Sequence, residues 1–263
     1  MRLSPQHVAL IKESFKECFL YGDKLFLFGS RVDDSLKGGD IDLYIETECT
    51  DSSRVFKRRM QFIGLLHRKL GEQKIDVVIK TPLDEASKLI YKEAQRAGIL
   101  MMKKETPLEF HIATADRHAK RLGEAVLYVQ KLSPVTSLDI ETLPPKDISF
   151  LDMLSMRFSK LQDLLGSRIF IKILELCEEK EFITIIDKLN RLEKLGYLES
   201  ASWWISLRDL RNDITHDYPD DTHVIAEHVN GLVIKSCELL NYWKELKPKV
   251  EVLVEKQILA EHK

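Results

Sequence analysis

The 263-residue chain has few of the features that define secreted, membrane or disulfide-stabilised proteins. No apolar run approaches the ~20 residues that cross a bilayer, and the mixed polar start does not resemble a signal peptide. The cysteines are scattered without the spacing of metal ligands. Such a distribution is typical of reduced thiols in a cytosolic protein. There are four of them: Cys18, Cys49, Cys177 and Cys237. We therefore expect a cytoplasmic protein with no membrane partner.

The chain also lacks a strong charge of either sign, because its formal net charge is −2 at pH 7. Residues 1–105 carry 19 Lys and Arg against 16 Asp and Glu, whereas residues 106–263 carry 21 against 26. Proteins that bind nucleic acid irrespective of sequence are usually far more basic. Any contact between the second part and RNA is therefore expected to be local and brief.

The apolar pattern changes near Pro82 and predicts an α+β protein with two domains. Before this point, short apolar strands at 24–28, 40–46 and 74–80 alternate with a helix that begins after Ser4 and a second helix at 51–70. After it the sequence predicts almost only helices, at 106–132, 148–178, 182–195, 201–217 and 222–245. We expect a small α/β domain over residues 1–104 and an antiparallel helical bundle over residues 105–263.

Paired carboxylates mark the first candidate site. Asp40 and Asp42 are two residues apart on a predicted strand, so their side chains share a face. Two carboxylates about 4 Å apart repel by ~4 kcal/mol at an effective dielectric of 20, a cost that a shared cation removes. Mg²⁺ prefers such oxygen ligands. Asp76 lies within an apolar strand, where a carboxylate needs a partner, and a shared metal is one.

A phosphate-binding turn precedes this pair. Gly29 and Ser30 end the first apolar strand, where glycine lets a phosphate approach the backbone and serine can donate hydrogen bonds to it. Attack on an α-phosphate then needs little beyond positioning and charge neutralisation by metal.

Residues 1 to about 100 resemble the minimal nucleotidyltransferase domains of the polymerase-beta-like superfamily. Their pattern is an apolar strand, Gly-Ser, a spacer of nine or ten residues, Asp-x-Asp and a later third acid; the spacer here is residues 31–39. The resemblance implies that Mg²⁺ is held by Asp40, Asp42 and Asp76, and that Asp76 can assist deprotonation of the acceptor. It further implies that the triphosphate of ATP is bound by Gly29, Ser30 and Arg31.

A second candidate site lies near the C-terminus, in a predicted helix that Pro219 ends. His216 would sit in its last turn and could move a proton during attack of an RNA 2′-hydroxyl on the adjacent phosphate. Arg211 could stabilise the developing charge without a metal. Five residues turn a helix through about 500°, which leaves these two side chains about 140° apart. A pair of helices from two subunits could complete the site, so we expect a homodimer through the helical domain.

The surrounding segments strengthen this second motif. Residues 155–166, residues 192–198, Trp203 or Trp204, and the run Arg211-Asn212-x3-His216-x-Tyr218 resemble the HEPN toxin family called HepT. That family is a dimeric helical ribonuclease, and its antitoxin partner MntA, a minimal nucleotidyltransferase, adenylylates the motif tyrosine. The resemblance implies that Tyr218 is modified. The family pair is usually two chains, whereas both parts are fused here, so one site could have lost its activity.

Three functions remain open from the sequence. The first is a fused toxin–antitoxin protein, in which the N-terminal domain adds AMP to Tyr218 of the C-terminal ribonuclease. The second is a small-molecule nucleotidyltransferase that resembles aminoglycoside-modifying enzymes, with a helical substrate-binding domain. The third is a non-enzymatic regulator, which the set Asp40, Asp42 and Asp76 disfavours. The motif with Arg211 and His216 favours the first function over the second.

Overall fold

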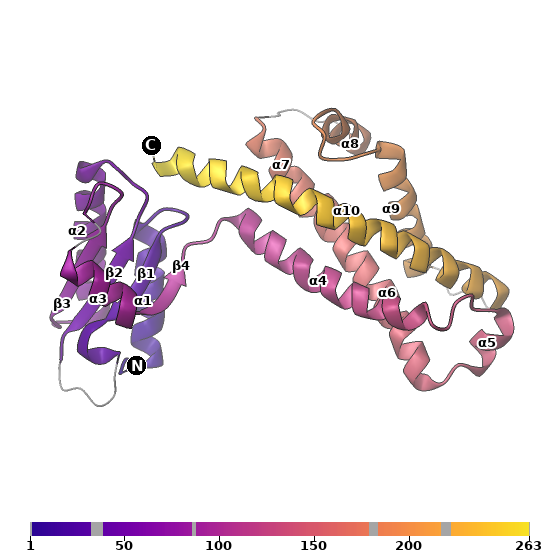
Figure 1. Ribbon diagram of the computed structural model, residues 1–263, viewed down its shortest axis with the longest axis horizontal. Coiled ribbons are helices and arrows are strands. Elements are labelled where there is room, and N and C mark those ends of the chain that lie inside the picture. The colour runs from indigo at the N-terminus through magenta and orange to yellow at the C-terminus, as the bar shows by residue number, and fades with distance from the viewer. Residues whose placement is uncertain (1, 33–38, 86–87, 179–183, 217–221, 263) are drawn as a thin grey trace. The chain divides into compact units, whose positions relative to one another are not determined.

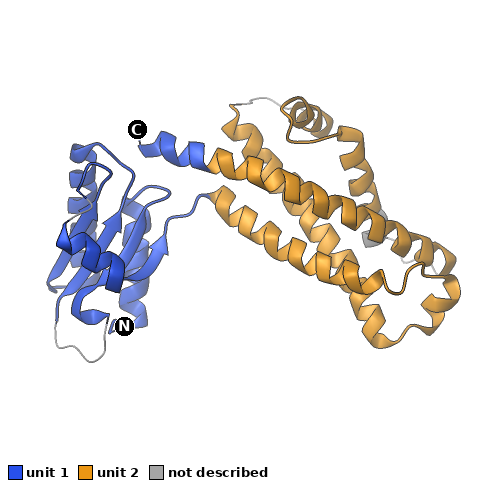
Figure 2. Ribbon diagram, viewed as in Figure 1, with its two compact units in different colours: residues 1–106, 255–263 blue, residues 107–254 orange. Residues whose placement is uncertain are grey.

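A computed structural model describes residues 2–32, 39–85, 88–178, 184–216 and 222–262. The protein is α+β, as the sequence predicts, with a small sheet in the N-terminal part and helices after it. The chain divides into two compact units, coloured separately in Figure 2. Unit 1 comprises Met1–Thr106 together with Glu255–Lys263, and unit 2 comprises Pro107–Val254.

Unit 1 is built on a sheet of four strands in the order β3-β2-β1-β4. They are β1 (Lys24–Phe28), β2 (Ile41–Glu46), β3 (Ile75–Lys80) and β4 (Ile99–Lys103). β1 is antiparallel to both β2 and β4, whereas β2 and β3 are parallel. The first three strands confirm the prediction, and β4 corrects it, because almost only helices were expected after Pro82. β4 has no alternation of its own, and its strand character comes from pairing with the edge of β1.

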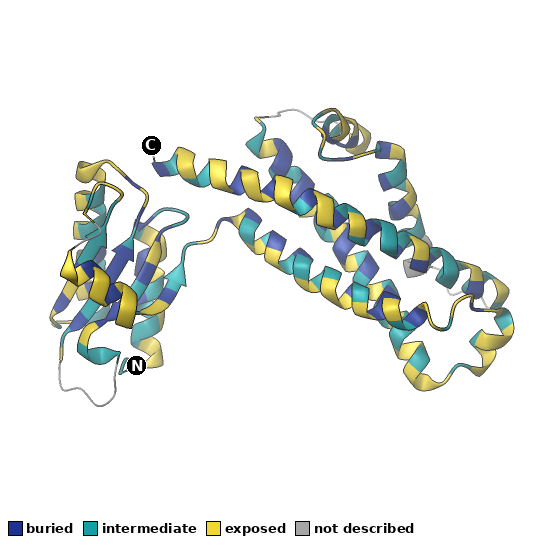
Figure 3. Cartoon of the chain, in the orientation of Figure 1, coloured by how far each residue is buried: buried dark blue, intermediate teal, exposed yellow. Residues whose placement is uncertain are grey.

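Two helices cover one face of this sheet. α1 (Pro5–Cys18) begins at Ser4, whose hydroxyl accepts a hydrogen bond from the His7 amide, as the sequence predicts. α2 (Ser52–Leu70) is capped by Asp51. Figure 3 shows the buried residues gathered on the inner sides of the elements. The core between sheet and helices comprises Ile11, Phe15, Phe19, Leu25, Leu27, Ile41, Leu43, Ile45, Phe62, Leu66, Ile75, Val77 and Met101.

The opposite face of the sheet carries α3 (Leu89–Ala97). Tyr91 and Ala94 of this helix pack with Phe28 and Tyr44 of the strands in a second, smaller buried cluster. Because successive strand side chains alternate between faces, Asp42 lies on the same face as Tyr44. The acidic residues are therefore kept out of the larger apolar core.

Unit 2 consists of helices along its described length (Figure 1). In chain order they are α4 (Pro107–Val129), α5 (Ser137–Thr142), α6 (Pro145–Leu164), α7 (Phe170–Leu176), α8 (Ile185–Lys194), α9 (Ala201–His216) and α10 (Thr222–His262). A π-helical turn at Leu165–Ile169 joins α6 to α7, so the single helix predicted at 148–178 starts earlier and has three parts. The helix predicted at 222–245 was too short, because α10 continues through Pro248 to His262.

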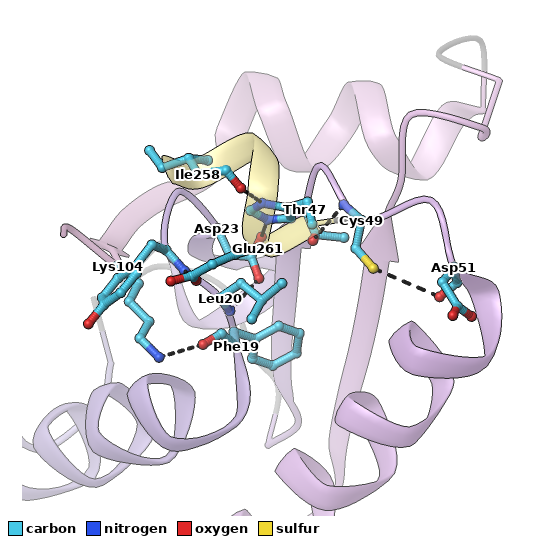
Figure 4. A network of polar contacts seen from close by, with 11 residues as sticks. Phe19, Leu20, Asp23, Thr47, Cys49, Asp51, Lys104, Ile258 and Glu261 are labelled. Atoms are coloured by element: carbon cyan, nitrogen blue, oxygen red, sulfur yellow. Dashed lines mark hydrogen bonds and ion pairs between the residues drawn. The ribbon is translucent and has the colours of Figure 1, made fainter. Parts of the chain in front are cut away.

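The last turns of α10 belong to unit 1 and contact Asp23, the residue before β1. His262 is 4% exposed and Asp23 is 1% exposed. His262 Nε2 lies 3.0 Å from Asp23 Oδ1, and His262 Nδ1 lies 2.7 Å from the Ile258 carbonyl. Asp23 also accepts a hydrogen bond from the Leu20 amide. Figure 4 shows Ile258 and Glu261 of α10 beside Asp23.

No helix in the described part of the chain is both long enough and apolar enough to cross a membrane.

Candidate active site

The turn after β1 brings a glycine against a carboxylate. Gly29 has a φ of +72° and opens a short 3-10 turn, Gly29–Arg31. A Cβ atom added to Gly29 would overlap the carboxylate of Asp42. The turn thus needs glycine for its backbone conformation and also for the space that Asp42 occupies.

The strand register places the acids together. Asp42 of β2 is paired directly with Asp76 of β3, and Asp40 immediately precedes β2. The prediction put Asp40 inside the strand, one residue from the observed boundary. Burial raises the pKa of Asp42, and the charges of Asp76 and Asp40 raise it further. The three carboxylates therefore repel one another in the folded protein, which is the electrostatic setting that a divalent cation relieves.

A lysine that the motif search missed lies among these acids. The Lys74 ammonium is 2.6 Å from Asp40 Oδ2 and 3.7 Å from Asp76 Oδ2. The hydrogen bond with Asp40 raises the pKa of Lys74. Lys74 precedes Asp76 by two residues, so the two share one face of the predicted strand at 74–80. This spacing is the sequence signal that could have identified Lys74. Its ammonium now supplies the positive charge between two of the carboxylates.

Arg31 is held by backbone carbonyls. Its guanidinium donates to the carbonyls of Asp40, Gly39 and Arg2, and Arg2 in turn donates to the carbonyl of Ser30. These bonds tie the turn after β1 to the segment that leads into β2. In this arrangement Arg31 fixes the two halves of the motif relative to each other, and its contact with a triphosphate stays a prediction.

The acids do not form a ready-made metal cage. Within the described ranges, no group of three or more His, Cys, Asp or Glu side chains is arranged to hold a metal ion. The donor chemistry nonetheless fits Mg²⁺, because Asp40, Asp42 and Asp76 offer only oxygen atoms. The Lys74 ammonium is a cation in contact with two of these carboxylates, and it would have to withdraw as a metal enters.

The second predicted site is described only in part. Arg211 lies in α9, where its Nη1 donates to Asp163 Oδ1 at 3.2 Å and its Nη2 donates to Asn212 Oδ1 at 3.0 Å. The α9 backbone is helical as far as His216. The side chain of His216 and the whole of Tyr218 lie outside the described residues.

Residues 8–101 match the family model described as a nucleotidyltransferase domain. The match runs from within α1 to within β4, and includes the turn at Gly29 and all three acids. Unit 1 therefore contains a nucleotidyltransferase domain, which makes the chain a transferase with a nucleoside triphosphate as a substrate. No curated protein matches the chain.

Proposed function

We propose that this protein is a Mg²⁺-dependent adenylyltransferase fused to a metal-independent HEPN ribonuclease, and that the first domain adds AMP from ATP to Tyr218 of the second. The observation that carries the transferase half is the register pairing of Asp42 with Asp76 beside Gly29. The match of residues 8–101 to a nucleotidyltransferase domain supports it. The ribonuclease half rests on the motif Arg211, His216 and Tyr218.

Transfer needs an acceptor oxygen positioned in line with the α-phosphate of ATP. Asp40, Asp42 and Asp76 would hold Mg²⁺, which neutralises the charge of the triphosphate when bound. The backbone of Gly29 and the hydroxyl of Ser30 would donate to phosphate oxygens. The acceptor oxygen forms the new bond to the α-phosphorus, the bond to the bridging oxygen breaks, and pyrophosphate leaves. The acceptor proton passes to Asp76, whose side chain is 56% exposed and therefore accessible.

Cleavage of RNA by unit 2 would use two residues of α9. His216 moves the proton of the 2′-hydroxyl, and Arg211 stabilises the negative charge on the phosphate. The backbone of α9 is helical from Arg211 to His216, and positions five residues apart on an ideal helix are separated by about 140°. We therefore propose a homodimer in which α9 of each subunit supplies part of each site. Light scattering that shows only monomer at micromolar concentration, together with full ribonuclease activity, would refute this arrangement.

Modification of Tyr218 would silence the ribonuclease. The tyrosine follows His216 by two residues in the sequence. An attached AMP brings a phosphate anion that competes with RNA for Arg211 through charge-assisted hydrogen bonds. The transferase domain would then act as a brake on the ribonuclease within one polypeptide.

Intact-mass spectrometry with Mg²⁺ and ATP tests the transfer directly. We expect the wild-type protein to gain one or more adenylyl groups, the Tyr218→Phe variant to gain none, and the Asp42→Asn variant to gain none while staying folded. Transfer that survives in Asp42→Asn would refute the assignment of the acids. ATP consumption only when a small-molecule acceptor is added, with Tyr218 unmodified throughout, would favour the small-molecule transferase.

Host growth tests the brake. A variant with both Asp40→Asn and Asp42→Asn should be toxic, and adding His216→Ala should relieve the toxicity. Normal growth of the double variant at equal expression, with intact cellular RNA, would show that the toxin–antitoxin function is wrong.

A further inference from the structure

Unit 2 contains a half-open cavity that neither proposed reaction explains. It has a volume of about 450 Å³ and lies among α6, the π-helical turn, α7, α8 and α9. This volume falls within the roughly 300–1,000 Å³ range of small-molecule sites.

One wall of the cavity is aromatic. Trp204 of α9 and Phe170 of α7 are each 2% exposed, and their ring centroids lie 4.5 Å apart. The π-helical turn brings Gly166 against the indole, where an added Cβ would lie 3.2 Å from Trp204 Cζ2. π-Helical turns inside α-helices are frequent at functional sites, and this one shapes the space beside Trp204.

The polar side chains that line the cavity have few partners. Gln162 is 3% exposed, and its amide forms no hydrogen bond found within the described residues. The Trp204 indole N–H, the half-buried Arg208 guanidinium and the half-buried Lys188 ammonium likewise have no acceptor in the part of the chain that the structure describes. These side chains line the cavity, so a ligand that enters it can use their hydrogen-bonding groups.

The charge of the cavity selects an anion. Among the described residues that line it, Lys188, Arg208 and Arg211 contribute three positive charges, and Asp163, which pairs with Arg211, contributes one negative charge. A polycationic drug would be repelled. A ligand with hydrogen-bond acceptors and a flat ring would satisfy the guanidinium groups and the aromatic wall together.

We propose that this cavity binds a nucleoside monophosphate unit, with the base against Trp204 and the phosphate at Arg208. The unit is either a free nucleotide or one residue of an RNA strand. The proposal rests on the proposed function in one respect, because Arg211 belongs to both the cavity and the ribonuclease motif. A base held here would set which nucleotide lies next to the cleaved bond.

Calorimetric titration of the full-length protein with AMP, adenosine and inorganic phosphate tests the proposal. Asp40→Asn/Asp42→Asn is used as the background, so that binding to the transferase domain is suppressed. We expect AMP to bind more tightly than either fragment, and Arg208→Gln to weaken AMP binding by about tenfold or more. Arg168→Gln, on the same unit but outside the lining, is the matched control and should bind like its parent. Trp204→Phe should change the affinity for AMP and adenosine but not for phosphate.

Equal AMP affinity in Arg208→Gln and its parent would overturn the proposal, as would phosphate binding as tight as AMP binding. Competition by a single-stranded oligoribonucleotide that depends on Arg208 would identify the ligand as RNA, whereas AMP binding without such competition would identify a free nucleotide. His216→Ala separates this proposal from the ribonuclease, because it should abolish cleavage and leave AMP binding intact. Retained AMP binding in a chain that never cleaves RNA would refute the ribonuclease alone.

Discussion

At the scale of single residues, Gly29 is constrained both by its backbone conformation and by the carboxylate beside it. Its φ of +72° disfavours a side chain, and its Cα lies against the Asp42 carboxylate. Gly71 has a similar φ of +79°, but an added Cβ there meets nothing within 4 Å. The two positions therefore separate backbone strain from disturbance of the acids.

We predict that Gly29→Ala abolishes nucleotidyl transfer and lowers the free energy of unfolding by about 1–2 kcal/mol, the cost of a left-handed conformation for an L-residue. Gly71→Ala should also be destabilised but should retain transfer. Urea unfolding and the transfer assay measure both effects. Equal activity of Gly29→Ala and Gly71→Ala would mean that the carboxylate position does not depend on the turn.

Lys74 would compete with a metal ion bound by the acids. Its ammonium contacts Asp40 and Asp76, so removal of the charge should free these carboxylates for a cation. We predict that Lys74→Met binds Mn²⁺ roughly twofold to fivefold more tightly than wild type in the absence of nucleotide, as expected for loss of an exposed ion pair. Lys80→Met, at the far end of β3, is the control. Weaker Mn²⁺ binding in Lys74→Met, measured by calorimetry, would instead indicate that Lys74 helps to hold the site together.

At the scale of elements, the packing of α4 against α6 contains a histidine beside an arginine. His118 Nδ1 of α4 lies 3.3 Å from Arg157 Nη1 of α6. Burial lowers the pKa of His118 from its ordinary 6.5, and the charges of Arg157, Lys160 and Arg117 lower it further. The histidine is therefore neutral in the folded unit over a range where it is charged in the unfolded chain.

We predict that unit 2 loses stability as the pH falls below about 6.5, the ordinary pKa of histidine. The unfolded state binds the proton first, so the stability present above that pH is lost as the pH falls through the lower pKa of the folded state. His118→Gln should reduce this dependence. His111, whose pKa burial also lowers, should account for part of the remaining slope. Urea unfolding at a series of pH values from neutral to acidic measures this pH dependence of the free energy of unfolding.

At the scale of the whole molecule, the C-terminal residues complete the N-terminal unit. Residues 255–262 are the last turns of α10, yet they pack with residues 1–106. The contact is made by the buried pair His262 and Asp23. An added Cβ at Gly22 would lie 2.8 Å from Ile258 Cγ2, so the helix also approaches this backbone closely.

We predict that His262→Ala lowers the free energy of unfolding of unit 1 by roughly 3 kcal/mol, because it leaves the Asp23 carboxylate buried without its ring partner. Ending the chain after Val254 should have at least as large an effect. His67→Ala, at an exposed position of α2, should unfold like wild type. Hydrogen exchange of residues 20–28 would localise the change, and unchanged protection there in His262→Ala would contradict the prediction.

Much of unit 1 followed from the sequence because its signals are local. The alternation of side chains on a strand put Asp40 and Asp42 on one face, and Ser4 and Pro5 marked the start of α1. Three of four strands and the α+β class were predicted in this way. β4 was not, because a short apolar segment without alternation becomes a strand only when a neighbouring edge accepts it. The roles of the predicted site residues stay predictions.

The sequence by itself determined the acidic motif and its glycine turn, since spacing along one strand decides which side chains share a face. Only the tertiary structure decided that Lys74 contacts two of the acids, that His262 pairs with Asp23 across 239 positions, and that Trp204 and Arg208 border one cavity. These contacts join residues from different elements, and their geometry depends on how whole helices and strands pack. The periodic pattern of apolar residues within one element carries no information about that packing, so these contacts could be found only in the tertiary structure.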